Sequence, residues 1–166
     1  MLLTILLSLL FIACIILMLY SAVALVQKKA LFSSAPKDVQ AAIIEKEAER
    51  FKGARAIGWV LIIISMSGIA GAFLFGAVNG IHNHFTLWQF FIRFLLMLYI
   101  YKAFDIICFD WFLLTKSHFF QHYYPEIEGC ESLNKFGFNR KSQTIKIIVF
   151  PFASLLAAWI CSLFVR

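Results

Sequence analysis

Four long apolar runs dominate the sequence, and each is long enough to cross a lipid bilayer. They cover roughly residues 3–26, 57–80, 86–108 and 143–165. About 20 apolar residues in a helix span a hydrocarbon core about 30 Å thick. The runs therefore predict an all-α, polytopic membrane protein. We expect four transmembrane helices in a single domain over residues 1–166, with amphipathic or interfacial segments between them.

The composition excludes a water-soluble globule. Hydrophobic residues make up 62% of the chain and charged residues 14%, against about 45–50% and about 25% in soluble domains. The mean hydropathy is +0.85, and 19 of the 166 residues are Phe. Polar side chains are too few to cover a globule, so most side chains are expected to lie in lipid.

The net charge of +6 does not indicate a nucleic-acid partner. Nucleic-acid-binding proteins carry their basic residues on one exposed polar face, whereas these lie in short loops between apolar runs. The charge is better explained by orientation in a bilayer and by attraction to anionic lipid headgroups. The four cysteines contain no C-x-x-C pair, so no disulfide framework is expected; they are Cys14, Cys108, Cys130 and Cys161.

The distribution of basic residues predicts the orientation. Residues 27–56 and 109–142 contain most of the Lys and Arg, whereas the 81–85 turn contains none. Basic loops face the cytoplasm in membrane proteins, so both termini and the 81–85 turn are predicted to be extracytoplasmic. The first run has no basic residues before it, which favours a span over a cleaved signal peptide.

The first predicted cytoplasmic loop contains signals for a surface helix. Ser33-Ser34-Ala35-Pro36 is a helix-start pattern, and the helix is expected to continue through residues 45–52. Glu47 with Arg50, and Glu49 with Lys52, form i, i+3 pairs that support it. Such a helix is either a docking surface for a partner or, more simply, a solvated charged face at the membrane edge.

The second predicted cytoplasmic loop is rich in aromatic residues. Their density over residues 117–124 is typical of the belt at lipid headgroups. Residues 134–141 mix aromatic and cationic side chains, which suits an interfacial segment that inserts Phe and pairs its cations with phosphates. An RNA-binding role for these eight residues is the disfavoured alternative.

Several short motifs resemble a family of small, functionally uncharacterised bacterial integral membrane proteins with four predicted spans. The motifs are Pro36-Lys37-Asp38-Val39-Gln40, Phe104-Asp105, Asp110-Trp111, Pro125 with Glu128-Gly129, and Phe136-Gly137-Phe138. The resemblance covers the Pro36 segment and roughly residues 100–140. It implies four spans in a bacterial inner membrane and supplies no activity, but it draws attention to Asp105 and Asp110.

The third run contains charges that a bilayer disfavours. Arg93, Lys102 and Asp105 lie within it and Asp110 lies just beyond. A charge at the bilayer centre costs about 2.5–3.5 kcal/mol on insertion scales. A rise of about 1.5 Å per residue from Trp88 puts all these side chains nearer an interface than the midplane. Arg93 is therefore expected to extend outward, and Lys102 to extend inward or pair with Asp105.

These charges permit two interpretations. In the first, they orient the helix and form an interhelical salt bridge. In the second, Lys102, Asp105 and Asp110 form a cytoplasm-facing pocket for an ion, a proton or an anionic headgroup, and Arg93 is a further candidate for binding an ion or a headgroup. Arg93 and Lys102 are nine positions apart and point in opposite directions on a helix, so a proton wire along this helix is disfavoured.

His118 and His122 form a candidate metal site. Histidines four residues apart lie on one side of a helix and can hold zinc or iron if a third ligand arrives, with Glu126 or Asp110 as candidates. The sequence lacks the Glu of a zincin, however. Histidines flanked by aromatic residues are more often interfacial, and no other cofactor motif is present.

The second run contains small residues at helical spacing, namely Gly68, Gly71, Gly76 and Gly80. Small residues let helix backbones approach closely in lipid. The pattern favours packing within the chain, with a homo-oligomer interface as the alternative.

Taken together, the residues favour a membrane module without enzymatic activity. Phosphate-binding Gly-rich loops, nucleophilic triads and paired catalytic carboxylates are absent. The expected role is an accessory or oligomeric scaffold that binds a membrane-protein partner or a second copy. The alternatives are a small transporter or channel component that uses Lys102, Asp105 and Asp110, and a metalloprotein that uses His118 and His122.

Overall fold

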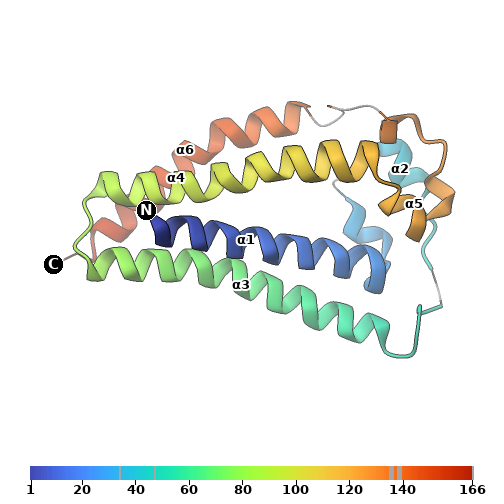
Figure 1. The fold of residues 1–166 in the computed structure, drawn as a ribbon, viewed down its shortest axis with the longest axis horizontal. Helices are drawn as coiled ribbons and strands as arrows, with labels where there is room; N and C mark the ends of the chain where they lie inside the picture. The colour runs from blue at the N-terminus through green and yellow to red at the C-terminus, as the bar shows by residue number, and fades with distance from the viewer. Residues whose placement is uncertain (34, 47, 135–136, 138–139, 166) are drawn as a thin grey trace. The chain divides into compact units, whose positions relative to one another are not determined.

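The structure is a computed structural model whose described residues are helical or irregular and include no strand (Figure 1). It describes residues 1–166 except 34, 47, 135–136, 138–139 and 166, and it leaves out the side chains of residues 115 and 134. An all-helical chain is what the long apolar runs predict.

Four long helices coincide with the four apolar runs. They are α1 (Leu2–Tyr20), α3 (Ala54–His82), α4 (Leu87–Phe104) and α6 (Arg140–Ser162). Within the described part of the chain, three helical segments are long and apolar enough to cross a membrane: Leu2–Val26, Ala54–His82 and Arg140–Ser162. The helix over the third run is not among them, and it is the one that contains Arg93 and Lys102.

Two of the long helices continue as π-helix. The segment η1 (Ser21–Val26) extends α1, and η3 (Asp105–Lys116) extends α4. η1 ends at Gln27, whose φ of 54° lies in the left-handed region. A left-handed residue is a common way to stop a helix, so the chain turns at Gln27 into the first connecting loop.

The chain forms two compact units. Unit 1 contains Met1–Ile15, Met66–Phe104 and Arg140–Arg166, and unit 2 contains Ile16–Ser65 and Asp105–Asn139. Unit 1 is therefore built from the long helices. Unit 2 contains helix ends together with the two long connections between helices.

Unit 1 has a core of closely packed helices, in which α4 packs along α6. The buried apolar residues come from all four long helices: Leu7, Ala72, Phe90, Phe94, Met97 and Ala158. The rings of Phe90 and Phe94 stack with centroids 6.2 Å apart.

Many large apolar side chains lie outside this core. Leu74, Phe152 and Leu163 are 65%, 69% and 65% exposed. Soluble monomers rarely expose contiguous apolar surface on this scale. Unit 1 therefore exposes many large apolar side chains on its outer surface.

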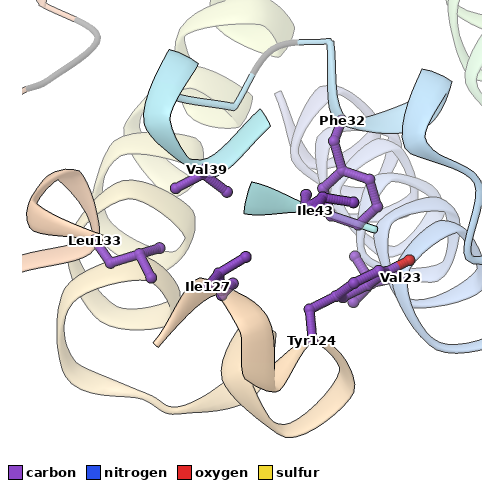
Figure 2. Close-up of a cluster of buried hydrophobic side chains, with 7 residues drawn as sticks. All are labelled: Val23, Phe32, Val39, Ile43, Tyr124, Ile127 and Leu133. Atoms are coloured by element: carbon purple, nitrogen blue, oxygen red, sulfur yellow. The ribbon is translucent and has the colours of Figure 1, made fainter. Parts of the chain in front are cut away.

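Unit 2 has its own core, to which both connections contribute (Figure 2). Its short elements are η2 (Lys29–Phe32), α2 (Lys37–Ala42), α5 (Phe119–Tyr123), η4 (Pro125–Ile127) and η5 (Glu131–Asn134). The buried residues are Val23, Phe32, Val39, Ile43, Tyr124, Ile127 and Leu133. Segments about 80 to 100 residues apart in the sequence therefore share one apolar cluster.

The helix predicted over residues 45–52 is wrong. α2 ends at Ala42, and Ile43 is extended, with ψ of 123°, and 1% exposed. The described residues from 43 to 53 contain no helix. The Ile44 N–H donates to Glu126 Oε1 at 3.3 Å, and the Gly53 N–H donates to Glu49 Oε2 at 2.8 Å. Burial of Ile43 and these bonds override the weak helical preference. The predicted Glu47–Arg50 pair is not described, because Glu47 lies outside the described residues.

Candidate functional site

Arg93 is a charged residue that is almost completely buried in unit 1. It is 5% exposed. Its Nη1 donates to the Gly76 carbonyl at 2.7 Å and to Asn79 Oδ1 at 3.0 Å. Its Cζ lies 4.3 Å from the centroid of the Phe85 ring. The guanidinium joins α4 to the last turns of α3, and its predicted extension toward the outer interface of the membrane stays a prediction.

Lys102, Asp105 and Asp110 lie near the junction of α4 with its π-helical extension. Lys102 is the last basic residue of α4 and is 2% exposed. Asp105 and Asp110 belong to η3 and are half-buried. All three residues take part in interactions within the chain. Their roles in binding an ion, a proton or a headgroup stay predictions.

His118 and His122 lie together at one short helix. His118 caps α5, and the His122 N–H donates to the His118 carbonyl at 2.9 Å. The His122 ring packs edge-on against Tyr123, with centroids 4.9 Å apart. No three His, Cys, Asp or Glu side chains within the described ranges are grouped so that they could hold a metal ion. The metal hypothesis stays a prediction.

The four glycines of α3 differ in their surroundings. A Cβ added to Gly80 would lie 2.9 Å from Phe90 Cζ, and one added to Gly68 would lie 2.6 Å from Cys14 Sγ. A Cβ at Gly76 would lie 3.3 Å from Leu7 Cδ1. A Cβ at Gly71 would meet nothing within 4 Å. Three of the glycines therefore face neighbours in the same chain, and Gly71 faces open space.

Sequence patterns gave no indication of a cavity of about 250 Å³ in unit 2. Residues from η1, the first connection and α5 line it: Gln27, Lys46, Ala48, Arg50, His122 and Tyr123. We call it the cationic pocket. Acidic and basic residues are interspersed over residues 45–52. This pattern predicts a helix whose cations lie on a solvated face. The described residues from 43 to 53 form no helix, and Lys46 and Arg50 line the pocket together with His122 and Tyr123 of α5.

A second cavity of unit 2, of about 530 Å³, adjoins α2 and η5. The Ser132 N–H donates to Asp38 Oδ2 at 3.1 Å. A hydrogen bond from the Ser132 side chain is the main reason why the pKa of Asp38 is lowered. Burial and then the Asp38 carboxylate raise the pKa of the nearby Cys130 thiol, which keeps that thiol protonated and unreactive at neutral pH.

Tyr124 lies at the centre of the unit 2 core and is 0% exposed. Its ring packs edge-on against Phe32, with centroids 4.9 Å apart. Its buried hydroxyl has no hydrogen-bond partner among the described residues. Burial, followed by the charges of Glu126 and Glu45, raises the pKa of the phenol, so the hydroxyl is neutral at any physiological pH.

The structure describes only part of the predicted interfacial segment. Residues 135–136 and 138–139 of the aromatic and cationic stretch 134–141 lie outside the described residues. The first part of the second connection, from η3 to η5, is described and contributes to the unit 2 core.

Comparisons with known proteins give no family or relative. No protein-family model, curated protein or solved structure matches the chain. Function must therefore be inferred from the residues and their arrangement.

Proposed function

We propose that the protein is a non-enzymatic membrane module with four spans, and that its connecting loops form a fixed scaffold for a partner. The partner is a membrane protein or a second copy of the chain. The proposed location is a bacterial inner membrane, as the sequence resemblance implies. Both termini would be extracytoplasmic, and the loops at 27–56 and 109–142 would be cytoplasmic.

The shared core of unit 2 carries the scaffold proposal. Two connections that only joined spans would not need to bury Ile43, Tyr124 and Ile127 to 1%, 0% and 1% exposure. Ordering a loop before it binds reduces the entropy lost on binding. Two loops held together by one core thus present a surface at low entropic cost, which suits an accessory protein.

The burial of the charges on α4 supports the fourth span. Arg93 and Lys102 are 5% and 2% exposed, whereas Trp88 and Ile92 on the same helix are 65% and 48% exposed. Charged residues in membrane helices face the protein interior. With both cations turned inward, α4 presents an apolar surface that lipid can cover.

Accessibility of single cysteines tests the membrane topology. In a chain without native cysteines, Asn83→Cys places a thiol in the 81–85 turn and Lys52→Cys places one in the first loop. We expect a membrane-impermeant maleimide to label Asn83→Cys in intact cells, and Lys52→Cys only after permeabilisation. The reverse pattern would overturn the orientation, and release of the protein from membranes by alkaline carbonate would overturn the spans.

Protection from protease tests the scaffold. The loops contain many Lys and Arg residues, so flexible loops in inside-out vesicles would be cut within minutes by trypsin. We expect resistance at Lys46 and Arg55, because the Lys46 side chain donates to the Tyr123 carbonyl and the Arg55 side chain donates to the Lys46 carbonyl. Rapid cleavage at both residues in the wild-type chain would contradict a preformed scaffold.

A transport role is the second candidate, and the burial of Lys102 favours it. A buried cation in a proposed span is the kind of group that binds ions or protons along a membrane path. Proton flux into proteoliposomes, followed with a pH-sensitive dye, tests this role. Flux that falls in Lys102→Ala and Asp105→Asn but not in Lys52→Gln supports it, and the absence of flux in the wild type removes it.

A further inference from the structure

The cationic pocket combines a small volume with an uneven distribution of charge. Two basic residues, Lys46 and Arg50, line it. None of its described lining residues is acidic. Glu47 lies outside the described residues, and the Glu49 carboxylate accepts the Gly53 N–H. The described lining therefore favours an anion.

Lys46 is held in place before any ligand arrives. Its ammonium donates to the Tyr123 carbonyl and lies 5.0 Å from the centroid of the Tyr124 ring. The ammonium has three N–H donors, and the carbonyl takes one. A cation fixed by a carbonyl and an aromatic face loses little freedom on binding, which strengthens binding.

Arg50 is positioned by the neighbouring aromatic residue. Its Cζ lies 5.1 Å from the centroid of the Tyr123 ring, and His122 packs against the same ring. Stacking on an aromatic face leaves the edge of the guanidinium free to donate. That edge matches the oxygens of a phosphate group in a bidentate arrangement.

Uncharged donors complete the lining. Gln27, whose side chain ends in an amide, lines the pocket and is 6% exposed. His122 adds an imidazole N–H. Pockets for drug-sized ligands measure about 300–1,000 Å³, so a cavity of about 250 Å³ suits a small group better than a nucleotide or large cofactor.

We propose that the cationic pocket binds a phosphate monoester through Lys46 and Arg50. The same chemistry is presented by a phospholipid such as phosphatidic acid and by a soluble ester such as glycerol 3-phosphate. The proposal depends on the packing of unit 2 and not on the number of spans, so the cysteine-labelling results and the binding results can fail separately.

Binding to the purified full-length chain in a neutral detergent tests the proposal. The probes are glycerol 3-phosphate, measured by titration calorimetry, and phosphatidic acid, measured by native mass spectrometry at fixed salt. Arg50→Gln is the main variant, because Arg50 is exposed and its loss should leave the unfolding temperature unchanged. Lys52→Gln is the matched control: it removes the same charge two residues away and outside the pocket lining.

We expect saturable binding by the wild type and by Lys52→Gln, and a loss of affinity of about tenfold or more in Arg50→Gln. Binding of both probes identifies the phosphate ester itself as sufficient. Binding of phosphatidic acid alone identifies a lipid headgroup as the source. The proposal is overturned if neither probe saturates the wild type, if Arg50→Gln binds as the wild type does, or if Lys52→Gln loses as much affinity as Arg50→Gln.

Discussion

The two units treat their cations in opposite ways. Unit 1 encloses Arg93 among apolar helices and bonds its guanidinium to the Gly76 carbonyl and to Asn79. Unit 2 keeps Arg50 exposed and stacks it on Tyr123 at the edge of a cavity. A buried cation that is hydrogen-bonded between two helices holds structure together, whereas an exposed cation at the edge of a cavity can bind a ligand.

The cores of the units also differ. The core of unit 1 joins regular helices whose backbone hydrogen bonds are made within each helix. The core of unit 2 joins short, irregular segments, and a long-range bond such as that from Ile44 to Glu126 fixes their positions. Unit 2 therefore depends on a few buried side chains, and single substitutions there should have the larger effects.

The largest effect is expected for Tyr124→Ala. Truncating a large buried aromatic residue costs about 3–5 kcal/mol, and Tyr124 contacts residues from both connections. We expect unit 2 to become sensitive to trypsin while the helices of unit 1 stay protected, as measured by limited proteolysis with mass spectrometry. Tyr124→Phe is the control, and it should be as stable as the wild type or more so, because the hydroxyl it removes has no described partner. Equal protection in Tyr124→Ala would contradict a single core.

A smaller loss is expected for Arg93→Ala in unit 1. The substitution removes two hydrogen bonds from a charged donor and the contact with Phe85. The expected loss is about 2–3 kcal/mol, read as a lower unfolding temperature of the purified chain. Arg93→Lys should recover part of the lost stability, since the lysine ammonium keeps the positive charge but lacks the planar set of donors of a guanidinium. If Arg93→Ala unfolds at the wild-type temperature, Arg93 is not a structural link.

Paired glycine substitutions should separate close packing from open surface in α3. Gly80→Ala forces a shift of the Phe90 ring and is expected to cost roughly 1–2 kcal/mol after the gain in helix propensity. Gly71→Ala meets no neighbour and should be neutral or stabilising by up to about 1 kcal/mol. Thermal unfolding of both variants checks this, and a loss in Gly71→Ala that matches Gly80→Ala would indicate that Gly71 packs against another copy.

The smallest effect on stability is expected for Asp38→Asn, and this effect should depend on pH. Its pKa is lowered below 3.8 in the folded chain, mainly by the hydrogen bond with Ser132. Because the pKa of the Asp38 carboxyl is lower in the folded chain, its ionised form stabilises the folded state above pH 3.8. This stabilisation is lost as the pH falls through the pKa of the folded state. We expect Asp38→Asn to loosen unit 2 slightly at pH 7, and to match the wild type once Asp38 is protonated. Protease sensitivity measured across pH tests this, and a difference that grows in acid would reverse the sign.

The long helices could be predicted from the sequence because their signal is local. The helical segments Leu2–Val26, Ala54–His82 and Arg140–Ser162 follow the apolar runs to within a few residues, since a helix makes its backbone hydrogen bonds within itself. Residues 45–52 show the limit. Their charge pairs favour a helix by only a few tenths of a kcal/mol each, and burial of Ile43 outweighs that.

The apolar runs thus determined by themselves that this chain is built of long helices with apolar surfaces, because length and hydropathy are properties of single segments. The cationic pocket was decided only by the tertiary structure. Lys46 and Arg50 lie more than 70 residues before His122 and Tyr123. No local pattern connects them, and the shared core of Ile43, Tyr124 and Ile127 brings the segments together. Side chains far apart in the sequence become one site only when a common core fixes both of their backbones.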